Sequence, residues 1–143
     1  MRVLATSTTE TTAAPEAVWR AWTDPALRPA WHPDLRWATY DGPVAPGTTG
    51  RWKPSRARPV DVVVTEADPT RRFVVRGTHG LPVARGHYVH ELEALPGGGT
   101  RITHTMGLTG PAAGLLDRVL GRMLAVSATP DAVAGVARVA EGL

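Results

Sequence analysis

The feature that constrains the fold most is the middle of the chain, where short β-type segments alternate with turns. Six segments rich in β-branched and aromatic residues are separated by groups of glycine, proline and aspartate. They lie at residues 36–40, 48–53, 60–66, 72–78, 86–95 and 100–108. The sequence PGGG at residues 96–99 is a strong hairpin signal between the last two. Because every connection is short, consecutive strands must run in opposite directions, which predicts an antiparallel sheet.

Further elements flank this region. Threonine-rich residues 3–13 predict a first strand, followed by a short helix that begins at Pro15 and a second helical turn at residues 25–28. Near the C-terminus, apolar residues at 115, 116, 119, 120, 123 and 124 recur with the helical period and predict a helix over roughly residues 112–141. Pro130, with Thr129 as an N-cap, leaves open a kinked helix or two abutting helices. This order predicts an α+β fold, in which six or seven strands accompany a long terminal helix.

Composition narrows the class of protein. A chain of 143 residues fits one domain, 1–143, and the absence of cysteine excludes disulfides, thiolate catalysis and Cys-ligated zinc. No signal peptide is recognisable and no apolar run reaches about 18 residues, so a cytoplasmic protein without a membrane span is expected. The net charge is only +3, and Trp52 is the one aromatic residue in the basic cluster at residues 51–58. Nucleic acid is therefore not an expected partner.

Several segments together resemble a known superfamily. They are AAPEAVWRAWTDP at 13–25, WHP at 31–33, PGTTGRW at 46–52, EADPTRRF at 66–73, GGTRITHTMGLTGP at 98–111 and VARVAEGL at 136–143. In this order they resemble the START-like (SRPBCC, or Bet v 1-like) superfamily, in particular its polyketide cyclase/dehydrase branch, over essentially the whole chain. The resemblance implies a helix-grip fold, in which a curved antiparallel sheet wraps around the terminal helix. It also implies an internal cavity for a small hydrophobic, polyketide- or lipid-like molecule.

Within that fold, the alternation of side chains along each strand assigns the residues that face the cavity. His104 shares a face with apolar Ile102 and Met106, and His90 shares one with Tyr88, so the two histidines are expected inside and adjacent. The same counting places Glu10 inward, although a slip of one residue would leave it in solvent. A neutral histidine and a carboxylate could together remove and return a proton beside a carbonyl group. Glu10, His90 and His104 are thus the candidate catalytic residues, and satisfied core histidines are the alternative.

The remaining predictions concern the cavity. We expect a volume of at least about 300 Å³, because the terminal helix changes from Leu and Met to Ala and Val after Pro130. Its mouth is expected near residues 45–47 and 80–85. The expected ligand contacts are Thr8, Thr12, Trp37, Trp52, Phe73, Val75, His79, Tyr88, Leu92, Met106, Leu120 and Leu124.

Cofactors and metals are not expected. The chain has no phosphate-binding GxxxxGK[ST] loop and no GxGxxG segment after a strand. His87 and His90 have a spacing that would place them on opposite faces of a strand, which argues against a shared metal. The sequence leaves open whether the protein is an enzyme or a non-catalytic carrier, and whether it forms a homodimer. The alternative function is a protein-interaction module, like the chaperone-activator branch of the same superfamily.

Overall fold

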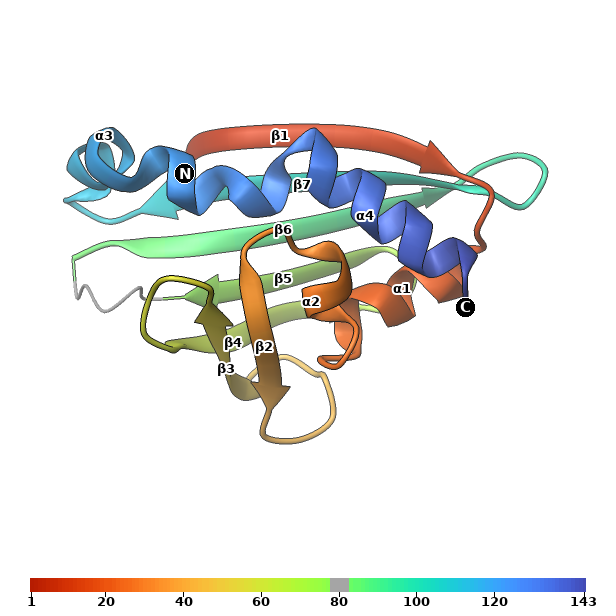
Figure 1. Cartoon of the computed structure of the whole chain (residues 1–143), viewed down its shortest axis with the longest axis horizontal. Helices are drawn as coiled ribbons and strands as arrows, with labels where there is room; N and C mark the ends of the chain where they lie inside the picture. Colours follow the sequence, from red (N-terminus) through yellow and green to blue (C-terminus); the bar gives the residue numbers. More distant parts are fainter. Residues whose placement is uncertain (78–82) are drawn as a thin grey trace.

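A single antiparallel sheet organises the computed structural model, which describes residues 1–77 and 83–143. Its strands are β1 (Arg2–Thr11), β2 (Leu35–Tyr40), β3 (Thr49–Pro54), β4 (Val60–Asp68), β5 (Arg72–Gly77), β6 (Arg85–Ala94) and β7 (Thr100–Thr109). They are hydrogen-bonded in the order β1-β7-β6-β5-β4-β3-β2, so that β1, the first strand of the chain, pairs with β7, the last (Figure 1). All six pairings are antiparallel, which confirms the predicted sheet.

Two short helices follow β1, and two longer ones end the chain. They are α1 (Pro15–Thr23), α2 (Arg28–Trp31), α3 (Ala113–Leu124) and α4 (Pro130–Glu141), with a 3₁₀ turn, η1 (Ala125–Ala128), between the last two. Thr129 has an extended backbone, and its hydroxyl accepts a hydrogen bond from the backbone N–H of Ala132. The predicted terminal helix is therefore two abutting helices, because Thr129 caps α4 and Pro130 occupies its first turn.

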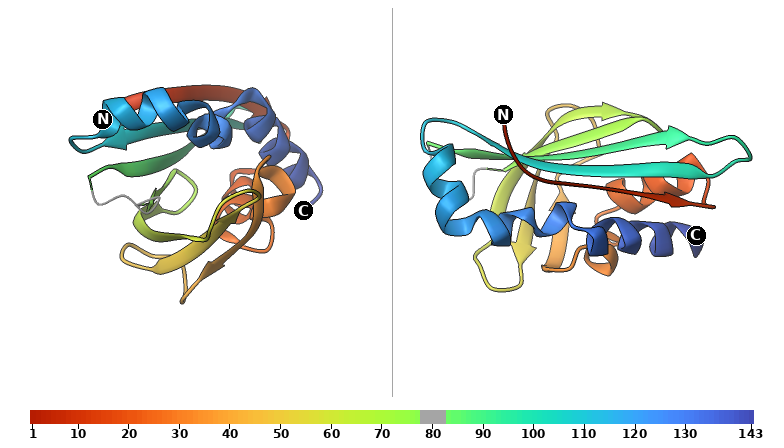
Figure 2. Two further views of the ribbon diagram at one scale, coloured as in Figure 1. Left: turned by 60° about the vertical axis from the view of Figure 1, so that its left-hand side comes forward. Right: turned by 90° about the horizontal axis from the view of Figure 1, so that it is seen from above.

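The terminal helices lie along the concave side of the sheet, as Figure 2 shows from two directions. Residues Ala113–Glu141 would be long and apolar enough to cross a membrane by length and composition alone, but half of the apolar window is buried inside the molecule. The extended residue Thr129 divides this segment into α3 and α4, and both helices contribute side chains to the core.

The alanine-rich face of α4 packs closely against α1, α2 and β1. A Cβ atom added at Gly135 would lie 2.8 Å from the carbonyl oxygen of Trp31 and 3.1 Å from its Cα. Glycine is therefore required where the backbones of α2 and α4 meet. The small side chains after Pro130 bring helices together here and do not leave a cavity.

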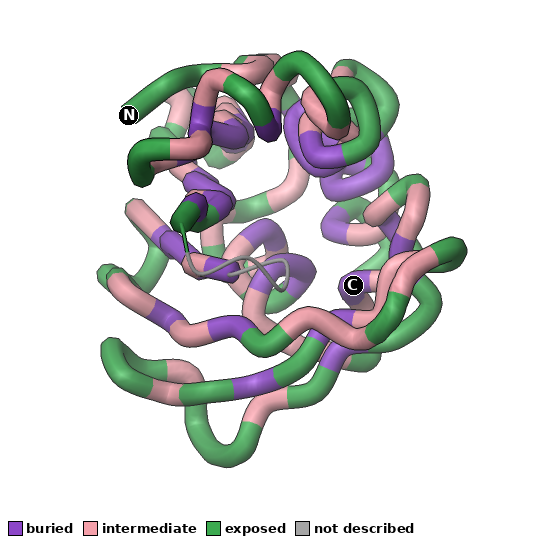
Figure 3. The backbone as a smooth tube through the Cα atoms, turned by 90° about the vertical axis from the view of Figure 1, so that its left-hand side faces the viewer, coloured by how far each residue is buried: buried purple, intermediate pink, exposed green. Residues whose placement is uncertain are grey.

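The core lies between the concave sheet face and the helices (Figure 3). Among its apolar side chains, Trp22, Phe73, Ile102 and Met106 are completely buried. On β6 and β7 the residues Tyr88, His90, Leu92, Ile102, His104 and Met106 are buried as predicted, Val89 is buried as well, and His90 lies directly opposite His104 in the strand register. The apolar residues beside these histidines fix which face of each strand is buried.

Candidate functional site

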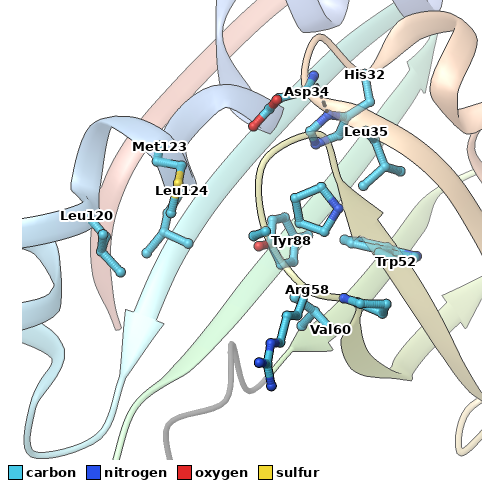
Figure 4. Close-up of a pocket in the computed structure, with 13 residues that line it drawn as sticks. His32, Asp34, Leu35, Trp52, Arg58, Val60, Tyr88, Leu120, Met123 and Leu124 are labelled. Atoms are coloured by element: carbon cyan, nitrogen blue, oxygen red, sulfur yellow. Dashed lines mark hydrogen bonds between the residues drawn. The ribbon is translucent and has the colours of Figure 1, made fainter.

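A pocket of about 440 Å³ opens at one end of the core, between the edge of the sheet and α3 (Figure 4). Its wall consists of His32, Asp34, Leu35, Trp52, Pro54, Ala57, Arg58, Pro59, Val60, Tyr88, Leu120, Met123 and Leu124. The volume agrees with the prediction of at least about 300 Å³. The helical part of the wall comes from α3, the Leu/Met half of the terminal segment, and not from the Ala/Val half as predicted.

Most of this wall is apolar. Leu120 and Leu124 lie one turn apart on the inner face of α3, and they face Trp52 and Tyr88 across the pocket (Figure 4). The rings of Trp52 and Tyr88 pack edge to face, with centroids 4.9 Å apart. A pocket lined in this way favours an apolar molecule, because the ligand exchanges water for hydrocarbon and aromatic contacts.

His32 is the best-defined polar group in the wall. It ends α2, and its Nδ1 accepts a hydrogen bond of 3.1 Å from the backbone N–H of Asp34. Because a backbone N–H can only donate, the neutral ring must carry its proton on Nε2. Burial, and then the positive charge of Arg28, lowers the pKa of His32 to about 3. His32 thus presents a neutral N–H donor at neutral pH.

Arg28, at the start of α2, lies directly behind the wall. Its guanidinium carbon is 3.8 Å from the ring centroid of Trp52 and 4.7 Å from that of Trp31. The side chain is completely buried, and Nη2 donates to Nε2 of His90 at 3.2 Å. Burial lowers the pKa of Arg28 to about 10, which leaves the group charged at neutral pH. Among residues 1–77 and 83–143 it forms no ion pair, and its Nε and Nη1 have no hydrogen-bond acceptor.

His90 and His104 lie side by side in the core, as predicted, with ring centroids 4.8 Å apart. Nε2 of His104 accepts from the indole N–H of Trp22 at 2.9 Å, and its Nδ1 donates to the carbonyl of Ser127. His90 accepts from Arg28 and donates through Nδ1 to the carbonyl of Phe73. Burial lowers the pKa of both rings, to about 3 for His104. Both rings are therefore neutral, with both nitrogens engaged.

Neither His90 nor His104 belongs to the pocket wall. The prediction that both project into one cavity together with Glu10 is wrong. The two histidines are satisfied groups of the core beneath the pocket, which was the alternative left open from the sequence.

Glu10 lies on the opposite side of the sheet from its predicted position. It is exposed and forms an ion pair of 3.2 Å with Arg101, its neighbour on β7. β1 ends at Thr11, whose buried hydroxyl accepts from the N–H of Ala13 and donates to Glu141 at 2.6 Å. The bend after Thr11 shifts the alternation by one residue relative to a strand counted back from Pro15. The slip considered from the sequence is what the structure shows.

The other predicted contact residues fall into three groups. Trp52, Tyr88, Leu120 and Leu124 line the pocket. A second group is buried in the core without lining the pocket: Phe73, Val75, Leu92 and Met106. The third group lies at the surface and comprises Thr8, Thr12 and Trp37. His79 lies outside the described residues.

The surface group was misplaced for two physical reasons. Thr8 and Thr12 follow the shifted alternation of β1, and the Thr8 hydroxyl pairs with that of Thr103 on the exposed face. Trp37 keeps 39% of its surface exposed because it lies on the outer face of the edge strand β2. The pocket is bordered by residues 57–59 of the β3–β4 loop and not by residues 45–47; residues 80–82 lie outside the described part.

Sequence reasoning missed the polar end of the pocket. His32 is part of the WHP segment, Asp34 follows that segment, and Arg58 belongs to the basic cluster, so both segments were recognised but no role was assigned to these residues. Arg28 gave no signal, because an arginine in a short helix is ordinarily a surface residue. Only the packing of α2 against Trp52 shows that it is buried.

Comparisons with known proteins agree with this architecture. A hypothetical protein from Helicobacter pylori superimposes with a TM-score of 0.74 at 15% identity, covering 94% of this chain and 85% of that one. TTHA0849 from Thermus thermophilus gives 0.67 at 20% identity, covering 96% and 97%. Ara h 8.0201 gives 0.65 at 18% identity, covering 96% and 93%. No curated protein matches the sequence.

At these identities the likeness shows the fold, which is the Bet v 1-like helix-grip fold. A family model described as polyketide cyclase/dehydrase and lipid transport matches residues 2–141. Because this match spans nearly the whole chain, the chain belongs to the polyketide cyclase/dehydrase and lipid transport family.

Proposed function

We propose that the protein binds a small, largely apolar molecule, polyketide- or lipid-like, in the pocket between α3 and the edge of the sheet. The observation that carries this proposal is a pocket of about 440 Å³ with a mostly apolar wall and a few polar groups gathered in it. Pockets of this size and character are typical sites for small organic ligands. Membership in a family that includes cyclases and lipid carriers supports the same class of ligand.

Three polar side chains would orient the molecule. His32 offers an N–H donor, Arg58 offers guanidinium donors, and Asp34 offers a carboxylate acceptor. Each buried polar atom of a ligand needs a hydrogen-bond partner, so these three side chains would fix the orientation of the ligand. Because they are few in an apolar wall, the ligand itself need carry only a few polar atoms.

If the protein is also an enzyme, its acid–base groups would be Asp34 and His32. A carboxylate at the pocket wall could accept a proton from a carbon beside a carbonyl, while His32 donates a hydrogen bond to the carbonyl oxygen. The catalytic role predicted for Glu10, His90 and His104 stays a prediction without support from the geometry, since Glu10 lies on the outer face and both histidine rings are fully engaged.

The binding proposal is tested by filling the pocket. Leu124→Trp places a larger side chain in the wall, and we expect at least about a tenfold loss of affinity for the neutral fluorescent probe N-phenyl-1-naphthylamine. Leu115→Trp is the matched control, because Leu115 lies on the same helix with 64% of its surface exposed. Titration by fluorescence measures both, after circular dichroism shows that each variant is folded. Equal affinities for the two variants would contradict binding in this pocket.

A second candidate, the protein-interaction module, is favoured by one observation. Leu115, Val119 and Met123 recur every four residues on α3 and expose 64%, 69% and 46% of their surfaces. Such a stripe is typical of a helix face that packs against another protein. If it joins two copies of this chain, sedimentation should show a dimer that Val119→Ser converts to a monomer. A wild-type protein that is monomeric at high concentration would contradict self-association.

A further inference from the structure

A buried positive charge, that of Arg28, lies behind one side of the pocket wall, and no carboxylate in the described part of the chain pairs with it. Arg28 is surrounded by His90 and Tyr88 on β6, Tyr40 on β2, and His32 at the end of α2. None of these groups is anionic at neutral pH: burial raises the pKa of both tyrosines and lowers that of both histidines. Isolated charges are rarely buried in proteins without a partner, because the loss of hydration is costly.

Several hydrogen-bond donors around this charge also lack acceptors. Among the described residues, the buried side-chain atoms without a partner are Nε and Nη1 of Arg28, Nε1 of Trp52 and the hydroxyl of Tyr40. Burial raises the pKa of Tyr40, and the nearby charge of Arg28 and the indole of Trp52 oppose this rise only in part. All four atoms can donate, and their residues lie close together: the guanidinium of Arg28 packs on the ring of Trp52, which lines the pocket, and Tyr40 is near both. Donors gathered around a positive charge make this side of the pocket favourable to a group that accepts hydrogen bonds.

The wall in front of this charge carries a fixed donor. His32 holds its proton on Nε2, and no protein acceptor takes it in the described part of the chain. Because the ring stays neutral, it donates a hydrogen bond without itself becoming a cation. The pocket wall itself has one cation, Arg58, and one carboxylate, Asp34, so the charge of Arg28 behind the wall makes the surroundings of the space positive by one.

We propose that the pocket selects a ligand whose apolar body carries an ionised oxygen, such as a phenolate or an enolate, and that His32 donates to this oxygen with Arg28 directly behind it. The inference rests on the proposed function, since it requires that a small molecule occupy the pocket. Arg28 is a positioning and electrostatic residue in this proposal: its charge acts across the ring of Trp52. In a poorly hydrated site, a fixed charge at short range favours the ionised form of the ligand more strongly than it would in water.

The ionisation of a bound phenol tests this directly. The probe is 7-hydroxy-4-methylcoumarin, whose neutral and ionised forms absorb at different wavelengths, and the control probe is 7-methoxy-4-methylcoumarin, which cannot ionise. We expect the pKa of the bound hydroxyl probe to fall by about one unit, equivalent to about a tenfold preference for the anion. The affinity of the methoxy probe should not change with pH between about pH 6 and pH 9, because His32 has a pKa of about 3 and stays neutral throughout.

Three variants assign the effect to residues. Arg28→Met should remove most of the preference for the anion, measured as the ratio of affinities for the hydroxyl and methoxy probes. Arg138→Met is the matched control, because it removes the same charge from the exposed side of α4 and should leave the ratio unchanged. His32→Phe keeps a ring of similar shape without the donor, and should lower the ratio even if Arg28→Met fails to fold.

The outcomes separate the two proposals. A bound hydroxyl probe with an unchanged or raised pKa, alongside a methoxy probe that binds, would overturn the anion preference and leave ligand binding intact. The anion preference would equally be overturned if Arg28→Met and His32→Phe both kept the wild-type ratio of affinities. If neither probe binds the wild-type protein, the proposed function is contradicted and the anion preference falls with it.

Discussion

The buried histidines of this protein differ in their hydrogen-bond partners. His104 is complete, with the indole of Trp22 on one nitrogen and the carbonyl of Ser127 on the other. His32 lines the pocket and accepts a backbone N–H on Nδ1, whereas its Nε2–H has no acceptor among the described residues. Both rings have their pKa lowered to about 3 by burial, so the difference between them lies in their partners and not in their charge.

The role of His104 predicts a stability effect. Trp22→Phe keeps an aromatic ring but removes the N–H, which leaves Nε2 of His104 buried without a donor. We expect the free energy of unfolding to fall by about 1–3 kcal/mol, measured by urea denaturation. Trp37→Phe makes the same chemical change at a residue with 39% of its surface exposed, and should stay within about 0.5 kcal/mol of wild type. Equal losses of unfolding free energy in the two variants would show that the Trp22–His104 hydrogen bond does not stabilise the fold measurably.

How far the sequence predicts individual residues depends on how uneven the two faces of a strand are. On β7, Ile102 and Met106 alternate with threonines, so only one face can be buried and the inward position of His104 follows. On β1, both faces carry threonine or serine, and nothing in the pattern distinguished Glu10 inward from Glu10 outward. The polar end of the pocket depends on packing between α2 and β3, which no local pattern encodes.

At the scale of elements, the two terminal helices have different roles. α4 is built from small residues and holds α1 and α2 close, whereas α3 carries the larger side chains that line the pocket. The number and order of strands were predictable because turn residues mark each connection. The division between α3 and α4 was predictable only in part: Pro130 and Thr129 indicated the break, but not which half would face the pocket.

The contact between α2 and α4 predicts a second stability effect. Gly135→Ala would place a methyl group 2.8 Å from the carbonyl oxygen of Trp31, and backbone atoms cannot move aside cheaply. We expect a loss of about 1–3 kcal/mol, although alanine is the better helix former. At Gly114, in α3, the nearest atom to an added Cβ is 4.0 Å away, so Gly114→Ala is the matched control and should be neutral or slightly stabilising. Thermal unfolding compares the two; a neutral Gly135→Ala would show that α2 can move away from α4.

For the whole molecule, the buried neutral histidines predict sensitivity to acid. In the folded protein the pKa of His104 is about 3 and that of His90 is also far below 6.5, whereas the unfolded chain has ordinary values. At a pH between the folded and the unfolded pKa, the unfolded state binds more protons than the folded state. The stability that the neutral histidines contribute is therefore fully present above about pH 6.5 and is lost progressively as the pH falls. Each ring should cost about 2 kcal/mol between pH 6.5 and about pH 5.

Melting curves recorded by circular dichroism check this effect. The melting temperature should fall clearly from about pH 7 to about pH 5, a range in which exposed carboxylates stay ionised. A constant melting temperature over this range would show that His90 and His104 either accept protons in the folded state or remain exposed to water.

The break at Thr129 has a consequence for how this pocket could change over evolution or by engineering. The polar end of the pocket, with His32 in the wall and Arg28 behind it, belongs to α2, whose backbone lies close against Gly135 of α4. The apolar corner is attached to α3, on the other side of an extended residue. Substitutions at Leu120, Met123 or Leu124 should therefore change which carbon skeleton fits the pocket, while the proposed contacts to the ligand oxygen stay the same. The same fold could in this way accept a series of related molecules without any change in the residues that hold their oxygen atom.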